Sequence, residues 1–249
     1  MNTIWLSFVG LSKKPTFWLG MLLTVVVFSI LINLGLWQLS RADEKQQLEQ
    51  RLSDRESAAM IPLAQLEVLK FDYLTGLRAE GIVRPMPKRY LLLDNQTHAG
   101  KVGYLAYQLV SLDNGKYALL ERGFVAASGA RSDLPNVGWL QEPLNVQARL
   151  YQRSTNPLSD ELMLEQGVPS RIQNLNIAQL SNHWRIDIEP YVLQPLNQPW
   201  PYAQPWIPIP LSSAKHFGYA VQWFSMALVL VILSLWVLYR ALRKGVHHE

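Results

Sequence analysis

The sequence predicts a membrane protein in which two transmembrane α-helices flank an exported α+β domain built mainly on a small antiparallel β-sheet or barrel. Three observations favour this class. Apolar residues make up 49% of the 249 residues, and they are concentrated near the two ends of the chain. Each end holds an uncharged run that is long enough to cross a bilayer. The segment between these runs alternates short β-type stretches with turn residues.

The first apolar run covers residues 17–39 and contains no charged side chain, and its only amides are Asn33 and Gln38. Because a helix rises ~1.5 Å per residue, the run can cross a hydrocarbon core of ~30 Å. A signal peptide would have a shorter apolar core followed by a small-residue cleavage site, so we interpret the run as an uncleaved anchor. Strong helix formers at 41–57 predict that the helix continues for several turns beyond the membrane.

The second apolar run covers residues 216–239 and opens with a histidine. Its length also suits a membrane-spanning helix. Because helical residues three or four positions apart share a face, the start of this run is expected to place an imidazole and two aromatic rings on one stripe. That stripe consists of His216, Tyr219, Ala220 and Trp223.

The end of the first run carries a second stripe, with Asn33, Trp37 and Arg41 at intervals of four residues. Tryptophan suits the membrane interface, and an arginine there suits an anionic partner. The chain leaves the membrane after residue 39 and re-enters it at His216, so both stripes are expected at the same membrane surface. We expect them to wall a groove that suits a planar apolar ligand.

The formal net charge of +4 resides in the two tails. Residues 1–16 carry two lysines, and residues 240–249 carry three basic residues against one glutamate, so the segment between the helices is neutral. This distribution speaks against nucleic-acid binding. By the positive-inside rule it places both termini in the cytoplasm and residues 40–215 on the other, periplasmic side. The short N-terminal tail lacks the features of an organelle transit peptide, which favours a bacterial inner membrane with lipid as a partner.

The exported segment, residues 40–215, shows a pattern of strands and turns. The strand candidates are 89–93, 104–112, 116–125, 144–151 and 190–193. Asp113-Asn114-Gly115 predicts a hairpin between the second and third of them. Asn174 is predicted to cap a helix over 175–181. Six prolines within 195–210 predict an extended tether that leads back to the membrane.

Sequence motifs offer little support for catalysis. The best match is the S-x-x-K spacing at 212–215, which would suit a membrane-anchored serine hydrolase, but the K-T-G and S-D-N motifs that accompany it are missing. The chain has no cysteine, which excludes thiolate metal sites and covalent c-type haem attachment. His98, His183 and the pair His247-His248 are isolated and are expected at the surface. We therefore predict that the protein is not an enzyme.

His216 differs from the other histidines because of its position. An ionisable side chain at the edge of a membrane helix either reaches out to water or serves as a ligand or proton site. Neutral imidazole is a normal axial ligand of haem iron, so His216 is the candidate metal ligand. Tyr219, Trp223 and Trp37 would supply apolar contact to the ring, and Arg41 would meet a haem carboxylate at the surface.

Residues 34–41 (LGLWQLSR) with Lys45, and residues 216–224 (HFGYAVQWF), resemble the two membrane-helix signatures of the surfeit locus protein family of cytochrome oxidase assembly factors. In the segment between these two motifs the chain resembles the family more loosely. The matching residues there are Leu93-Asp94-Asn95, Gly100, Gly103-Tyr104, Gly115 and Arg122-Gly123-Phe124-Val125. The chain departs from the family pattern at Glu121 and Phe124, where the family has asparagine and tryptophan, and at Leu109, where the family has proline.

The resemblance implies an assembly factor for haem-copper cytochrome c oxidase that binds haem A transiently and helps to insert it into the catalytic subunit. It places His216 at the family's haem-linked histidine. It also implies two partners, the catalytic subunit of the oxidase and the haem A synthase. The alternative is a membrane scaffold that never ligates haem. Whether one chain or a homo-oligomer holds the haem stays open.

Overall fold

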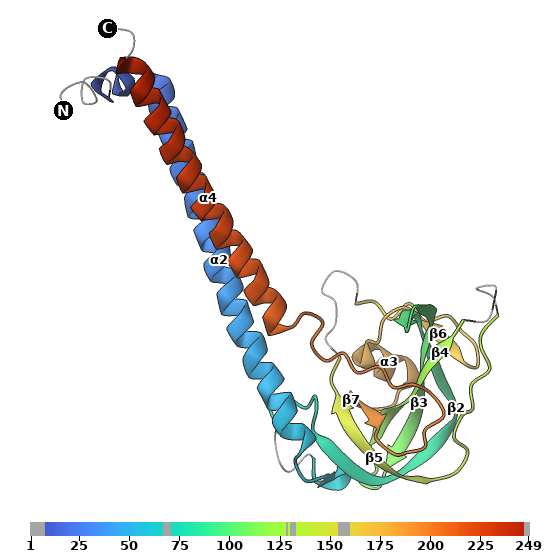
Figure 1. Cartoon of the computed structure of the whole chain (residues 1–249). Helices are drawn as coiled ribbons and strands as arrows, with labels where there is room; N and C mark the ends of the chain where they lie inside the picture. Colours follow the sequence, from blue (N-terminus) through green and yellow to red (C-terminus); the bar gives the residue numbers. More distant parts are fainter. Residues whose placement is uncertain (1–7, 67–70, 128, 130–132, 154–159, 247–249) are drawn as a thin grey trace. The chain divides into compact units, whose positions relative to one another are not determined.

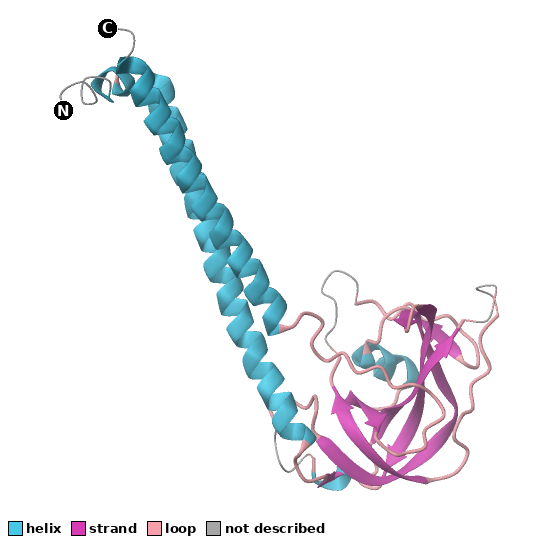
Figure 2. Cartoon of the chain, viewed as in Figure 1, coloured by secondary structure: helices cyan, strands magenta, loops and turns pink. Residues whose placement is uncertain are grey.

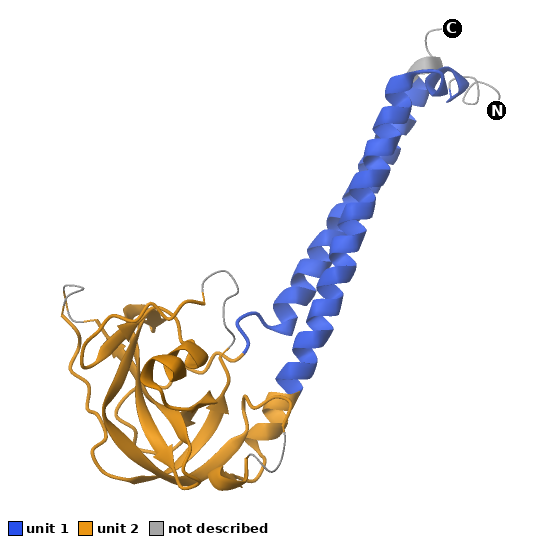
Figure 3. Ribbon diagram, turned by 180° about the vertical axis from the view of Figure 1, so that it is seen from behind, with its two compact units in different colours: residues 1–50, 209–249 blue, residues 51–208 orange. Residues whose placement is uncertain are grey.

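The computed structural model describes residues 8–66, 71–127, 129, 133–153 and 160–246. The chain separates into two compact units (Figure 3). One is helical and combines residues 1–50 with residues 209–249. The other, residues 51–208, is the β-rich domain. Each unit is described by itself below.

Two long helices, α2 (Pro15–Glu56) and α4 (Ser213–Val246), dominate the helical unit (Figure 1). The expected continuation of the first helix beyond Leu39 is present, because α2 ends only at Glu56. Within the most apolar part of each helix, only 6% of the residues are buried inside the protein. Exposed apolar surface of this length calls for lipid around it. The chain is therefore a membrane protein with two spanning helices around a β-rich central domain.

The two helices pack against each other with opposite chain directions. Gly35 of α2 lies against Phe224 of α4, and Gln38 of α2 lies against His216, which is earlier in α4. A Cβ atom at Gly35 would come within 2.6 Å of the Phe224 ring, so only glycine fits there without a shift. Ala220 and Ala227 are the fully buried small residues of α4. Small side chains let helix backbones approach closely in a membrane, where hydrophobic attraction between helices is absent.

The β-rich domain is built on one sheet (Figure 2). The strands are β1 (Ile61–Pro62), β2 (Arg78–His98), β3 (Lys101–Leu112), β4 (Tyr117–Ala126), β5 (Leu144–Tyr151), β6 (Ser170–Ile172) and β7 (Ile188–Pro195). Their order is β1-β2-β3-β4-β7-β5, and β2 also pairs with β5, which closes the sheet into a barrel. The expectation of a barrel is met in this form.

The sheet is mixed rather than purely antiparallel. β4 and β7 pair in parallel, and so do the short strands β1 and β6 with β2. The long strand β2 continues through Pro85 and Pro87 because the register with β3 shifts between Pro85 and Tyr90. Such an irregularity lets a strand carry proline, which cannot donate a ladder hydrogen bond. The hairpin predicted at Asp113-Asn114-Gly115 joins β3 to β4, with Ser111 opposite Tyr117.

Strand β3 is buried on both of its faces, which shows where the core lies. Residues 103–110 are all buried. One set of β3 side chains packs with α3, whose Leu180 and Trp184 belong to the same cluster. The opposite face of β3 contributes Val110 and Leu112 to the largest cluster, which also draws on β2, β4, β5 and β7 and therefore fills the barrel. Tyr104 and Ala106 belong to a smaller cluster with Val137.

Helix α3 spans Ile177–Trp184, later than the predicted 175–181. The predicted cap at Asn174 is wrong, because the N-cap is Asn176, whose side chain accepts a hydrogen bond from the Gln179 N–H. Asn174 instead donates from its amide to the Glu161 carbonyl at 2.9 Å. Both asparagines suit an N-cap, so only the tertiary contact separates the two choices.

The proline-rich segment after β7, which was predicted to be an extended tether, is bound to the domain over much of its length. We call residues 196–206 the strap. The Leu196 N–H donates to the Gln147 carbonyl at 2.7 Å, and the Phe124 N–H donates to the Ala203 carbonyl at 2.8 Å. The Trp200 indole N–H donates to the Arg122 carbonyl at 2.8 Å. Proline removes N–H donors, so side chains and carbonyls of the strap make most of these bonds.

Candidate functional site

His216 lies in the first turn of α4 and faces α2. Its side chain is buried, with 8% of the residue exposed, and its Nδ1 atom lies 2.8 Å from Oε1 of Gln38. An amide oxygen can only accept a hydrogen bond, so Nδ1 carries the proton in this arrangement. The tautomer that fits this bond leaves Nε2 free of a proton, which is the form of imidazole that binds a metal.

A second polar contact joins the two helices where α4 begins. Glu49 of α2 accepts hydrogen bonds from the Ser213 N–H at 2.9 Å and from the Ser213 hydroxyl at 2.6 Å. The first N–H groups of a helix lack partners within the helix, so a carboxylate from α2 supplies the missing acceptor. This contact fixes the start of α4, and with it the turn that carries His216.

Two of the three aromatic residues predicted to surround His216 are largely exposed. Trp37 is 50% exposed and Tyr219 is 48% exposed, whereas Trp223 is half-buried. Among the described residues, no ring contact joins His216 to any of the three. The structure thus brings His216 together with Gln38, and it leaves Trp37 and Tyr219 on the outer surface of the helix pair.

Arg41 is exposed and already has a partner one turn further along α2. Its guanidinium lies 2.6 Å from the Glu44 carboxylate and 5.8 Å from the centre of the Trp37 ring. A carboxylate ligand would therefore have to compete with Glu44. Because the pair is exposed, its own stabilising effect is small, and exchange of one carboxylate for another is inexpensive.

Gln38 is the functional candidate that sequence reasoning missed. The signal was present, because an amide inside the uncharged run 17–39 is unusual and needs a partner in lipid. The other amide of that run, Asn33, satisfies its side chain locally by donating to the Ser29 carbonyl at 2.7 Å. Gln38 could be distinguished from Asn33 only once the partner on α4 was known.

The β-rich domain contains a second concentration of buried polar groups. Glu121 of β4 is 1% exposed and Gln194 of β7 is fully buried. The Gln194 amide donates to Glu121 at 3.0 Å, and its oxygen accepts from the Arg149 Nε at 2.6 Å. Burial raises the pKa of Glu121 to about 7. It lowers the pKa of Arg149 to about 10, so this arginine stays charged at neutral pH.

Arg122-Gly123-Phe124, the motif next to Glu121, is where the strap is attached. The Arg122 carbonyl accepts from Trp200 and Gln204, and its guanidinium donates through Nε and Nη2 to the Gly138 carbonyl at 3.1 and 2.7 Å. Gly123 has φ of +119°, and a Cβ there would lie 2.6 Å from the Ala203 carbonyl oxygen. The motif therefore has a structural task in this domain.

The remaining candidates from the sequence are the S-x-x-K stretch and the other histidines. In the S-x-x-K stretch, Ser212 lies just before α4 and Lys215 is exposed, and the described residues show no hydrogen bond between these two side chains. His98 lies near Phe124, and His183 lies in the last turn of α3, whereas His247 and His248 are outside the described residues. Within the described part of the chain, no group of three or more His, Cys, Asp or Glu side chains is placed to hold a metal ion.

Comparison with known proteins gives one match. The model of the SURF1 family matches residues 25–228, which covers most of the chain, including both helix motifs and the whole β-rich domain. A search of curated proteins found no match.

Proposed function

Because this chain belongs to the SURF1 family, whose members are assembly factors associated with cytochrome oxidase, we propose that it binds haem A transiently and helps to insert it into the catalytic subunit of the oxidase. Its task in oxidase assembly follows from the family. The haem ligand and the direction of transfer are the parts that this proposal adds.

The hydrogen bond between His216 and Gln38 is the observation that carries the proposal. A histidine that ligates haem usually has its other ring nitrogen hydrogen-bonded, which fixes both the tautomer and the ring orientation. In this chain the bond at Nδ1 leaves Nε2 as the ligand atom. Haem iron accepts a neutral imidazole as an axial ligand, so the donor set fits the group.

The neighbouring side chains have separate tasks in this proposal. Trp37, Tyr219 and Trp223 offer aromatic surface beside the helix pair, and such surface suits a large planar ring. Arg41 meets a haem carboxylate in exchange for Glu44. The contact with Gln38 holds the Nδ1 side of the His216 ring against α2.

The same proposal includes the cellular setting. We place the two helices in a bacterial inner membrane, with both termini in the cytoplasm and the β-rich domain in the periplasm, because the excess positive charge lies in the two tails. His216 then lies at the periplasmic surface. The haem A synthase would supply the haem, and the oxidase subunit would receive it.

A scaffold without haem is the second candidate, and one observation favours it. His216 is only 8% exposed, and the bond to Gln38 joins the two helices whether or not a ligand is present. In that case the imidazole would serve helix packing, and the helices would hold the oxidase subunit directly.

Purification of the protein from cells that make haem A separates the two candidates. Under the proposal, the wild-type protein carries haem A with the spectrum of a nitrogen-ligated iron. His216→Ala loses the pigment but keeps its membrane level, because the helix stays apolar enough to insert. His98→Ala and His183→Ala are the matched controls, and they keep the pigment. Full haem stoichiometry in His216→Ala would reject the ligand assignment and favour the scaffold.

A further inference from the structure

Arg149 on β5 is held in place by a buried chain of polar side chains. Its Nε donates to Gln194 at 2.6 Å, and Gln194 in turn donates to Glu121 and, at 2.9 Å, to the Pro205 carbonyl in the strap. Glu121 and Gln194 are both fully buried. Buried polar groups are expensive unless they are satisfied, and a satisfied chain of this kind orients the group at its end.

The guanidinium of Arg149 is fixed on one side and open on the other. It stacks on the ring of Trp206, with the guanidinium carbon 3.8 Å from the ring centre. Its two terminal nitrogens make no hydrogen bond or ion pair with any described residue. Glu56 and Glu121 act on it only through charge attraction without contact. Arg149 thus keeps a preoriented pair of N–H donors, the arrangement that binds planar anions in a bidentate manner.

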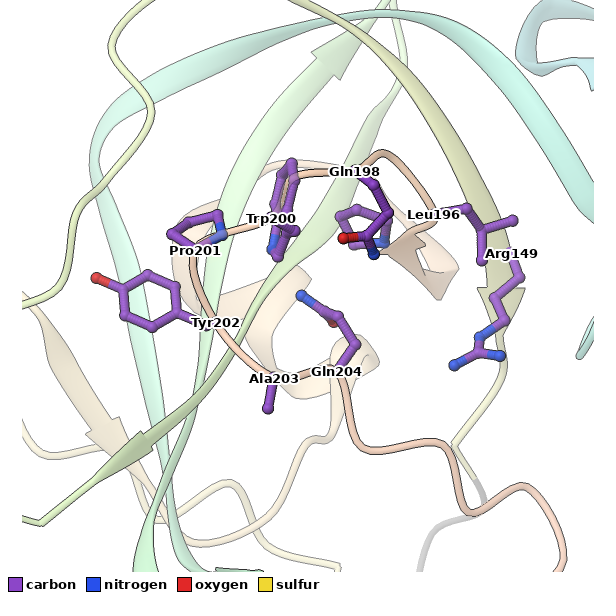
Figure 4. A pocket seen from close by; sticks show the side chains of 9 residues that line it. Arg149, Leu196, Gln198, Trp200, Pro201, Tyr202, Ala203 and Gln204 are labelled. Atoms are coloured by element: carbon purple, nitrogen blue, oxygen red, sulfur yellow. The ribbon is translucent and has the colours of Figure 1, made fainter.

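These donors belong to a pocket of about 500 Å³ formed between β5 and the strap (Figure 4). The pocket is lined by Arg149, Pro195, Leu196, Gln198, Trp200, Pro201, Tyr202, Ala203 and Gln204. Figure 4 shows the amides of Gln198 and Gln204 inside the loop of the strap, with Arg149 across from them. The Oε1 atom of Gln204 is buried and has no hydrogen-bond partner among the described residues.

The charge of the pocket points to the kind of ligand. Arg149 is the one charged residue in its lining, so the wall carries a single positive charge and no carboxylate. A monoanion would be neutralised, whereas a phosphate with nearly two negative charges would keep an uncompensated charge in a partly buried site. The unpartnered oxygen of Gln204, another lining residue of this pocket, would accept a hydrogen bond from a ligand N–H. The last residue of a peptide offers both groups, a carboxylate and a preceding N–H.

We propose that this pocket binds a monoanionic carboxylate through Arg149, and that a peptide C-terminus fits it better than a small free acid. The proposal goes beyond the haem function and does not depend on it, because all of its residues lie in the β-rich domain. Gln194 is the positioning residue, and Glu121 supports it through the buried hydrogen bond that it accepts from the Gln194 amide.

Calorimetric titration of the full chain in detergent tests the proposal with four probes. These are an N-acetylated Ala-Ala-Ala peptide with a free carboxylate, the same peptide with an amidated C-terminus, acetate, and inorganic phosphate. We expect saturable binding of the free peptide, weaker binding of acetate, and at least about tenfold weaker binding of the amidated peptide and of phosphate. If acetate binds as tightly as the free peptide, the pocket is a carboxylate site, but the preference for a peptide C-terminus is rejected.

Variants link the binding to the guanidinium. Arg149→Gln should weaken binding of the free peptide at least about tenfold. Arg149→Lys should also weaken this binding, because an ammonium group cannot donate in the bidentate geometry. The matched control is Arg84→Gln, which removes an exposed arginine of β2 that pairs with Asp113 at 2.7 Å. If Arg149→Gln lowers the unfolding temperature, the affinity of Arg149→Lys is used to test the proposal instead. Unchanged affinity in the folded Arg149 variants, tighter binding of phosphate than of peptide, or no saturable binding would each overturn the proposal.

Discussion

His216 Nδ1 and Gln38 Oε1 are 2.8 Å apart, so a side-chain hydrogen bond joins the two apolar helices. His216 is buried between the helices and Gln38 is half-buried, so water has little access to replace either partner. The loss of one side chain therefore leaves the other with an unsatisfied polar atom. The bond binds the two helices together and, in the proposed function, also prepares the imidazole for iron.

Gln38→Leu should separate these two effects from each other. Under the proposed function we expect haem retention to fall about tenfold, because the lost acceptor frees the tautomer and orientation of His216. Gln38→Glu should restore most of the retention, since a carboxylate oxygen also accepts from Nδ1. The measurement is the haem-to-protein ratio with the absorption spectrum of the purified variants. Gln222→Leu, an exposed amide on α4, is the control. Equal retention in wild type and Gln38→Leu would show that Gln38 has no positioning role.

Gly123→Val should reduce the amount of folded protein sharply. The new side chain would lie within 3 Å of the strap at Ala203 and Tyr202, and the φ of +119° disfavours any residue with a Cβ. We expect a loss of several kcal/mol in the free energy of unfolding, as large as that of an overpacked core site. Gly115→Ala is the control, because Gly115 has φ of +81° but open space around it, so only the backbone strain of about 1–2 kcal/mol remains.

Membrane abundance and the unfolding temperature in detergent measure the effect of Gly123→Val. Normal abundance and stability combined with loss of oxidase assembly would contradict the prediction. The Arg122-Gly123-Phe124 motif would then be a contact site for a partner rather than the attachment point of the strap.

The stability of the β-rich domain should decrease as the pH rises from about 4.5 to 7. Burial raises the pKa of Glu121 from 4.5 in the unfolded chain to about 7 in the folded domain. In this range the folded state holds a proton that the unfolded state has released, so raising the pH favours unfolding. Above about pH 7 both states have lost the proton, and the contribution of Glu121 becomes constant.

Glu121→Gln should remove this pH dependence and raise the unfolding temperature at pH 8 relative to wild type, because the amide needs no proton to be neutral. Thermal unfolding at pH 5, 6, 7 and 8 is the measurement. Asp113→Asn, which changes an exposed carboxylate, should keep the wild-type dependence of unfolding temperature on pH. If this pH dependence persists unchanged in Glu121→Gln, a group other than Glu121 causes it.

The placement of the termini can be tested with reporters. A reporter that works only after export should be active when inserted at Asn114, in the hairpin between β3 and β4, and silent at the C-terminus. The physical reason is the positive charge of both tails. An inactive reporter at Asn114 would reverse the orientation, and His216 would then lie at the cytoplasmic surface.

Local signals in the sequence predicted the local structure well. The uncharged runs predicted α2 and α4, and Asp113-Asn114-Gly115 predicted the hairpin, because in each case neighbouring residues determine the outcome. The parallel pairing of β4 with β7 could not be predicted, since these strands are far apart in the chain and either direction satisfies their hydrogen bonds. The first half of β2 was also not predicted, because Pro85 and Pro87 speak against a strand. Only the pairing with β3, whose register shifts at this point, shows that the strand continues.

The candidate site was predicted only in part. The position of His216 at the start of an apolar helix identified it, but the rotation of α4 against α2 decides which of its neighbours face it. That rotation depends on the fit of Gly35 to Phe224 and on the buried alanines, which form a three-dimensional pattern. Sequence spacing alone therefore grouped His216 with Tyr219 instead of with Gln38.

The closure of the barrel restricts how the domain can meet other proteins. Among the described residues, each of the five long strands has a neighbour on both sides over part of its length, and the short strands β1 and β6 end the sheet. Along these paired stretches an extended segment from another chain finds no free strand edge, which protects them from edge-to-edge aggregation. Strand addition is closed to partners there as well. A protein that binds these stretches must recognise side chains, loops or the strap.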